Sequence, residues 1–165
     1  MRAIRPADPR ASRQERMIRH GSNCPALAAL SCNSGRMTSI QPELWVEPAG
    51  QAIAFYVDAF GARVLHHVGE GDDIVAQLAV GEAAFWVAAA GPDSGRFSPR
   101  AIGGATSRIL LVADDPGAVV RRAVDAGATE KSAMCEEHGW YLGRIVDPFG
   151  HEWEIGKPPG PWPPP

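Results

Sequence analysis

The sequence predicts an α+β domain that contains two copies of one β-α-β-β-β unit. Two segments have apolar residues at helical spacing, and each ends at a glycine, Gly61 or Gly127. One short apolar segment precedes each helix, and three segments of strand-like composition follow it. The copies also share local sequence, because VDAFGA at 57–62 corresponds to VDAGA at 124–128. A duplication of this kind predicts two similar modules that pack together to bury their sheets.

In the first copy, apolar residues at 53, 54, 57 and 60 have the spacing of one helix face. Gly81-Glu82 lies between two apolar segments and is typical of a hairpin turn. The expected elements are a strand at 42–48, a helix at 51–60 and strands at 62–68, 74–80 and 83–89.

In the second copy, Pro116 suits the first position of a helix, and Asp114 or Asp115 can cap it. The turn DPFG at 147–150 has proline at its second position, which is typical of a tight turn. The expected elements are a strand at 107–113, a helix at 117–126 and strands at 129–135, 141–146 and 151–156.

Charge divides the chain near residue 36. Residues 1–36 carry seven arginines against two acids, a net charge of +5, whereas the rest carries nine basic and seventeen acidic residues, a net charge of −8. The first segment has no sustained periodicity, so we expect a disordered extension or a stretch upstream of a true start at Met37. Binding to an acidic partner and a targeting peptide are the alternatives. The predicted organisation is a domain at 37–158, with modules at 40–90 and 107–156, a linker at 91–106, and a Pro-rich tail at 159–165.

Composition argues against several classes of partner. A net charge of −3 disfavours nucleic acid, and no apolar run is long enough to cross a bilayer. The three cysteines, Cys24, Cys32 and Cys135, match no zinc-binding spacing, and their odd number disfavours a disulfide framework. We therefore expect a cytoplasmic protein with no nucleic-acid or membrane partner.

Three motifs resemble the glyoxalase-like branch of the vicinal oxygen chelate superfamily, which includes glyoxalases, bleomycin-resistance proteins and dioxygenases. They are FYVDAFG after the short first strand, DAGA at the end of the second helix, and WYLGRIVDPFGHEWEIGKP near the carboxyl end. The resemblance covers 37–158 and implies two modules that form an open, cup-shaped mixed sheet. It also implies a small-molecule ligand in the cup and a homodimer.

In the enzymes of this superfamily, a divalent metal is bound by residues from the first and last strand of each module. The internal repeat places the equivalent positions at Gln41, Phe85, Arg108 and Glu154. Phe85 has no lone pair to donate, and Arg108 is permanently positive. We therefore expect no metal centre of the family type, with Gln41 and Glu154 as weak candidate ligands. A divalent metal is the expected cofactor only if the protein is an enzyme with an atypical site.

First and last strands of a module are neighbours in the implied topology, so Arg108 is expected to face Glu154. We hypothesise that the guanidinium of Arg108 places its positive charge where the enzymes hold their metal. The pair of Arg108 and Glu154 then either contacts a ligand or is a plain ion pair. Because side chains alternate along each strand, further residues are expected on the same face as these four positions. The same alternation places Trp86 and Trp153 on the opposite, helix-facing side. The predicted ligand-binding residues are Gln41, Glu43, Trp45, Phe85, Arg108, Leu110, Glu152 and Glu154.

Three functions remain open at this point. The first is a metal-independent small-molecule binder of the bleomycin-resistance type, which the residues Phe85 and Arg108 favour. The second is a lyase, isomerase, epimerase or dioxygenase with an atypical site, in which Glu154 is the catalytic base or the one strong metal ligand. The third is a dimeric interaction module whose cup holds no ligand.

Overall fold

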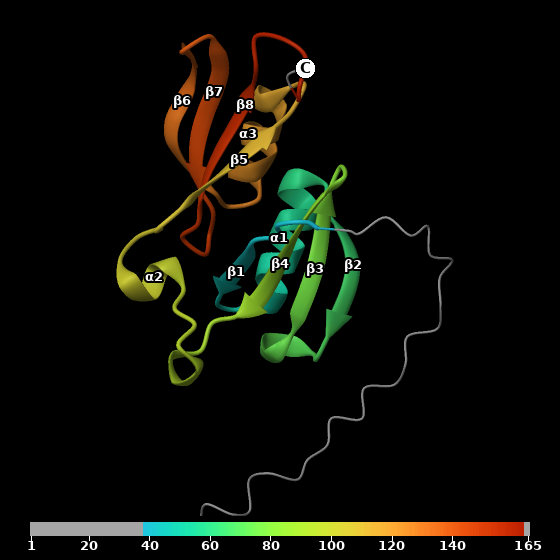
Figure 1. Cartoon of the computed structure of the whole chain (residues 1–165). Helices are drawn as coiled ribbons and strands as arrows, with labels where there is room; N and C mark the ends of the chain where they lie inside the picture. The colour runs from blue at the N-terminus through green and yellow to red at the C-terminus, as the bar shows by residue number, and fades with distance from the viewer. Residues whose placement is uncertain (1–37, 164–165) are drawn as a thin grey trace, which may run out of the picture. The chain divides into compact units, whose positions relative to one another are not determined.

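The structure is a computed structural model that describes residues 38–163. The segment predicted at 1–36 lies outside these residues. The same order of strands and helix occurs in two successive modules of the chain (Figure 1). The first module contains β1 (Glu43–Val46), α1 (Ala49–Phe60), β2 (Arg63–Val68), the 3-10 turn η1 (Gly71–Asp73), β3 (Val75–Val80) and β4 (Ala83–Ala89). The linker contains the 3-10 turn η2 (Pro92–Ser94) and the short helix α2 (Pro99–Ile102). The second module contains β5 (Arg108–Val112), α3 (Pro116–Asp125), β6 (Thr129–Glu137), β7 (Trp140–Val146) and β8 (Glu152–Lys157).

The strands form two four-stranded mixed sheets with the same topology. Their orders are β1-β4-β3-β2 in sheet 1 and β5-β8-β7-β6 in sheet 2. In both sheets the first and last strands of the module are parallel neighbours, and the other pairs are antiparallel. The predicted pair of β-α-β-β-β modules is therefore confirmed.

Local signals position both main helices. Gly61 follows α1 with a φ of 66°, a left-handed conformation that favours glycine. Asp115 caps α3, because its side chain accepts a hydrogen bond of 2.9 Å from the backbone N–H of Ala118. Pro116 is the first residue of α3, as the sequence predicted. The helix α2 was not predicted; Ser98 caps it within the linker.

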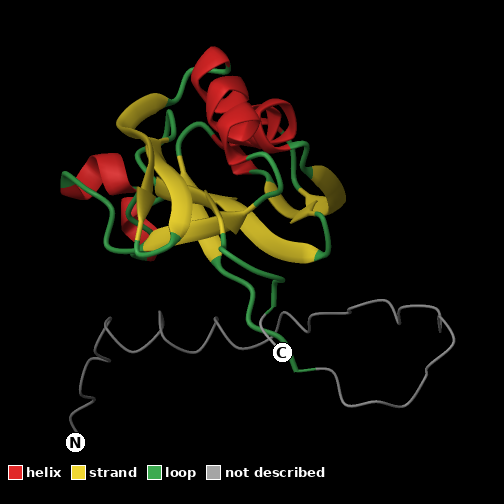
Figure 2. Ribbon diagram, turned by 90° about the horizontal axis from the view of Figure 1, so that it is seen from above, coloured by secondary structure: helices red, strands yellow, loops and turns green. Residues whose placement is uncertain are grey.

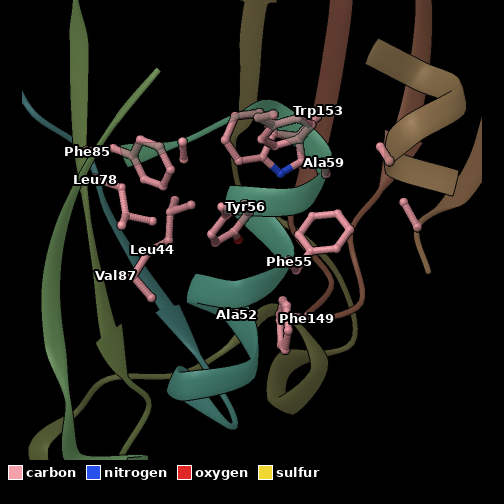
Figure 3. Close-up of a cluster of buried hydrophobic side chains, with 14 of the residues drawn as sticks. Leu44, Ala52, Phe55, Tyr56, Ala59, Leu78, Phe85, Val87, Phe149 and Trp153 are labelled. Atoms are coloured by element: carbon pink, nitrogen blue, oxygen red, sulfur yellow. The ribbon is translucent and has the colours of Figure 1, made fainter. Parts of the chain in front are cut away.

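One apolar core joins the two modules. Helices α1 and α3 are in contact, and Figure 2 shows the two longer helices next to each other over the strands. Tyr56 of α1 lies among Phe85 of β4, Trp153 of β8 and Phe149 of the turn before β8 (Figure 3). Because Phe85 and Trp153 come from different sheets and their rings lie 6.0 Å apart, the helix-covered faces of the two sheets meet in this core.

The opposite face of each sheet, here called its open face, points away from that core. In β1, Leu44 and Val46 are buried, whereas Glu43 is exposed. In β8, Trp153 and Ile155 are buried, whereas Glu152 and Glu154 lie on the open face. Among the described residues, no helix is long and apolar enough to cross a membrane.

Candidate functional site

The strand registers show which positions of the two modules are equivalent. In sheet 1, Leu78 is opposite Phe85 and Gln77 is opposite Trp86. In sheet 2, Ile145 is opposite Trp153 and Arg144 is opposite Glu154. Trp86 is therefore the equivalent of Glu154, and Phe85 is the equivalent of the buried Trp153.

The placement of Phe85 on the cup face was wrong by one residue. Phe85 is only 7% exposed and packs against Tyr56 and Trp153 in the core. The error arose because the two hairpin glycines are not equivalent. Gly81 is the first residue of a two-residue turn, since Val80 pairs with Ala83, whereas Gly150 is the fourth residue of the turn 147–150, and Val146 pairs with Glu152. Counting from these glycines therefore shifts the first module by one position.

The same shift corrects the expectation for Trp86. This residue was predicted on the helix-facing side with Trp153, but its indole N–H donates to Gln41 Oε1 over 2.9 Å. Trp153 does lie on the helix-facing side, where it is 3% exposed.

On the open face of sheet 1, neutral hydrogen bonds connect three side chains. Gln41 Oε1 accepts from Gln77 Nε2 at 2.8 Å and from Trp86 Nε1 at 2.9 Å. The indole N–H of Trp45 donates to Glu43 Oε1 at 2.9 Å. The predicted residues Gln41, Glu43 and Trp45 therefore share this face, and Gln77 and Trp86 join them.

On the open face of sheet 2, the equivalent positions are charged. Glu154 Oε2 accepts from Arg144 Nε at 2.8 Å and lies 3.3 Å from Arg108 Nη1. Arg144 Nη2 also donates to Glu137 over 2.8 Å. The hydrogen bond that Arg144 donates to Glu154 raises the pKa of Arg144, and the one that it donates to Glu137 acts in the same direction. The predicted pairing of Arg108 with Glu154 is present, and Arg144 is a second cation that the prediction missed.

The remaining predicted residues of sheet 2 lie on the same face. Glu152 accepts a hydrogen bond of 2.6 Å from Lys131 Nζ, and it lies 4.0 Å from Arg108. Leu110 is 44% exposed beside them, opposite Glu154 in the register of β5 and β8. Alternation along YLGRIV gives the face of Arg144, but the register of β7 and β8 is needed to place it opposite Glu154.

Three cavities border these residues. One, of about 340 Å³, lies over the open face of sheet 2, where Arg108, Glu154 and Arg144 line it with Leu110 and Trp140. A second, of about 360 Å³, is lined by Glu43 and Trp45. The third, of about 410 Å³, lies between the modules and is mainly apolar. Phe85 and Trp153 line this third cavity together with Gln41 and Leu110. Phe85 therefore borders a cavity, but not the one over the open face of sheet 2.

The four positions equivalent to metal ligands are thus Gln41, Trp86, Arg108 and Glu154. An indole N–H only donates hydrogen bonds, and a guanidinium repels a cation. Gln41 Oε1 already accepts two hydrogen bonds, and Glu154 Oε2 contacts two guanidinium groups. This set of donors does not fit a divalent metal centre. Within residues 38–163, no group of three or more His, Cys, Asp or Glu residues is arranged to hold a metal.

Comparison with protein-family models identifies the family of this chain. The model of the Glyoxalase/Bleomycin resistance protein/Dioxygenase superfamily matches residues 38–155. The uncharacterized protein Rv0887c of Mycobacterium tuberculosis is 35% identical over 129 residues, which cover 73% of this chain and 74% of that protein.

Solved structures give the same fold. The gene product AT5G48480 of Arabidopsis thaliana has a TM-score of 0.60 and 29% identity, with 73% of this chain and 99% of that chain covered. The fosfomycin resistance protein FosX of Listeria monocytogenes, crystallised with Mn(II) and a sulfate ion, has a TM-score of 0.58. It is 12% identical, with 73% of this chain and 90% of that chain covered, and this likeness supports the fold alone.

Proposed function

Because the chain belongs to the Glyoxalase/Bleomycin resistance protein/Dioxygenase superfamily, we propose that it is a metal-independent small-molecule binder. The observation that carries this proposal is which residues occupy the four positions equivalent to the metal ligands of the family. Two of them, Trp86 and Arg108, offer no lone pair to a metal cation. The side chains of the other two, Gln41 and Glu154, are held by hydrogen bonds within their own sheets.

The open faces have the chemistry of a ligand site. They combine aromatic rings with a few fixed polar groups, which is typical of small-molecule pockets. Trp45 and Trp86 supply the rings on sheet 1, and Arg108 and Glu154 supply charge on sheet 2.

The first test is the metal content of protein purified without chelator. We expect far less than one equivalent of Ni, Zn, Mn or Fe per chain. One equivalent of any of these metals would overturn the metal-independent proposal and support the enzyme alternative based on Glu154. A double variant, Trp86→Glu with Arg108→His, is the matched comparison. It supplies lone pairs at both positions, so it should bind metal more tightly than the natural chain.

The second test is a thermal-shift screen with small aromatic, sugar-like, cationic and anionic compounds, including bleomycin-type antibiotics. A ligand at about 100 times its dissociation constant adds about 2.7 kcal/mol to the free energy of unfolding, which is a measurable shift in Tm. The absence of any stabilising compound would favour an interaction module without ligand.

We also propose that the protein forms a homodimer. In one chain, the two open faces point away from the shared core, and the cavity lined by Arg108 and Glu154 includes neither Gln41 nor Trp86. A second chain can place its sheet 2 against sheet 1 of the first, which brings the four positions together. Light scattering after size-exclusion chromatography should give twice the mass of the 17.6 kDa chain. A mass of one chain at all concentrations would contradict the dimer.

A further inference from the structure

The three cations on the open face of sheet 2 differ in how fully their donors are used. Arg144 donates hydrogen bonds to two carboxylates, those of Glu154 and Glu137. Lys131 donates to Glu152 at 2.6 Å. Arg144 and Lys131 therefore already hold strong acceptors, and all three pairs combine hydrogen bonding with opposite charge.

Arg108 is the exception among these cations. Its Nη1 lies 3.3 Å from Glu154 and 4.0 Å from Glu152, but its side chain makes no hydrogen bond within residues 38–163. The Arg108 side chain is 46% exposed, compared with 14% for Glu154 and 19% for Glu152. A guanidinium carries five N–H donors, so Arg108 can present a pair of them to an incoming acceptor.

The cavity of about 340 Å³ gives such an acceptor a place to bind. Arg108 and Arg144 are part of its lining, and Leu110 and Trp140 supply apolar surface. The Trp140 ring is backed by Trp162 of the carboxyl-terminal segment, with the ring centres 5.4 Å apart and an angle of 72° between the planes. Edge-to-face contacts of this kind restrict the motion of an aromatic ring and so prepare it to pack against a ligand.

The local hydrogen bonds favour an anionic ligand over a cationic one. The charge of each of the carboxylates of Glu137, Glu152 and Glu154 is already paired with a cation, so a ligand ammonium would have to share a carboxylate with Arg144 or Lys131. A ligand carboxylate would instead use donors of Arg108 that no described residue accepts. The planar fork of a guanidinium matches the two oxygens of a carboxylate.

We infer that this open face binds small aromatic carboxylates, with Arg108 holding the carboxylate and Trp140 packing against the ring. The inference rests on the proposed small-molecule function and names the class of ligand. It assigns Arg108 a specificity-determining role. Glu154 and Glu152, which lie 3.3 Å and 4.0 Å from Arg108 Nη1, orient the guanidinium.

The experiment compares three probes of one shape on the full chain. These are 1-naphthoate, 1-naphthamide and 1-naphthylmethylammonium, which differ mainly in the charge of the group on the ring. Two-dimensional NMR titrations follow the Trp indole N–H and Arg Nε–H signals and give a dissociation constant for each probe. We expect the carboxylate to bind about tenfold more tightly than the amide, because a charge-assisted hydrogen bond is stronger than a neutral one.

Two variants test whether the preference for the carboxylate depends on Arg108. Arg108→Gln gives sheet 2 the residue that the equivalent position of sheet 1 already has, Gln41, and should remove the preference for the carboxylate. Lys131→Gln removes one positive charge from the same face but spares the Arg108 donors, so the preference should remain. The backbone NMR spectra of both variants report whether the fold is intact. If Lys131→Gln abolished the preference as fully as Arg108→Gln, general charge rather than the guanidinium would be responsible, and the inference would be wrong.

The probes separate this inference from the proposed function. Equal binding of amide and carboxylate would overturn the inference but leave small-molecule binding in place. Tightest binding of the ammonium would also overturn it and would indicate a cation site at Glu137 and the tryptophans. If none of the probes bound at millimolar concentration while the wider screen found ligands, the inference would again be wrong; failure of both would overturn the proposed function itself.

Discussion

Asp147 is a buried carboxylate whose partners come from both modules. It is 3% exposed. Its Oδ2 accepts from Tyr56 Oη at 2.7 Å and from Trp153 Nε1 at 3.0 Å, and its Oδ1 accepts from the backbone N–H groups of Phe149 and His151, both at 2.9 Å. Burial of a charge is costly unless hydrogen bonds compensate for the lost water. Because Tyr56 belongs to α1, this carboxylate also ties the first module to the second.

We predict that Tyr56→Phe lowers the free energy of unfolding by about 1.5–3 kcal/mol, the range for a hydrogen bond to a charged group. The substitution keeps the ring in the core and removes only the donor to Asp147. Urea denaturation followed by circular dichroism measures the effect. Tyr141→Phe is the control, since Tyr141 is 46% exposed and its hydroxyl has no partner among residues 38–163. Equal losses in the two variants would contradict the assigned role.

The same hydroxyl predicts a pH dependence in the alkaline range. Burial raises the pKa of Tyr56 well above its ordinary value of 10.0, and the charge and hydrogen bond of Asp147 raise it further. The folded state therefore keeps a proton that the unfolded state loses. The stability associated with this group is complete below pH 10.0 and falls as the pH rises from 10.0 toward the raised pKa. The advantage of the natural chain over Tyr56→Phe should shrink by about 1.4 kcal/mol per pH unit in that range. Urea midpoints measured between about pH 8 and pH 11 check this, and a constant difference would contradict it.

At the level of the elements, the sequence predicted both helices and all eight strands because each carries a local signal. Gly61 and Pro116 have conformational preferences that fix helix boundaries without reference to the rest of the chain. The linker helix α2 was missed because its four residues are too few to show periodicity. The face of β4 on which Phe85 and Trp86 lie was also predicted wrongly. Side-chain direction alternates with every residue, so an error of one residue in the count reverses the two faces.

The candidate site was predicted in part for the same reason. Arg108 and Glu154 were paired correctly because their positions follow from the topology of one module. Arg144 was missed because its contact depends on the register between β7 and β8, and turn length sets that register. Gln77 was missed in the same way, through the register of β3 and β4.

Strand β8 has little room beside Gly156. A Cβ at this position would lie 2.9 Å from the Leu142 Cβ and 3.5 Å from the Trp140 ring. We predict that Gly156→Ala lowers the free energy of unfolding by about 1–3 kcal/mol, as for other insertions into a packed site. Thermal unfolding followed by Trp fluorescence measures it. Gly160→Ala is the control, because nothing lies within 4 Å of a Cβ there, and its effect should stay within about 0.5 kcal/mol. Comparable losses in both variants would count against this account.

For the whole molecule, the shared core predicts that the modules fold together. Phe55, Tyr56 and Phe60 of α1 pack against Phe149 and Trp153 of the second module. We expect fragments 1–104 and 105–165 to lack cooperative thermal unfolding when separate, because each exposes the apolar surface that the other covers. Mixing them should restore near-ultraviolet circular dichroism and a cooperative transition. A cooperative transition in either fragment alone would show that the module has an independent core.

The duplication has placed three side chains at equivalent positions on both open faces, with different charge. Gln41, Gln77 and Trp86 form the neutral version, and Arg108, Arg144 and Glu154 form the charged one. Dissolved ions screen interactions between charges over about 8 Å at physiological ionic strength and about 3 Å at 1 M, but they hardly affect neutral hydrogen bonds. A ligand held by the charged face should therefore be released as salt is added, whereas one held by the neutral face should stay bound. Ionic strength alone can thus distinguish the two faces in the natural, unmodified chain.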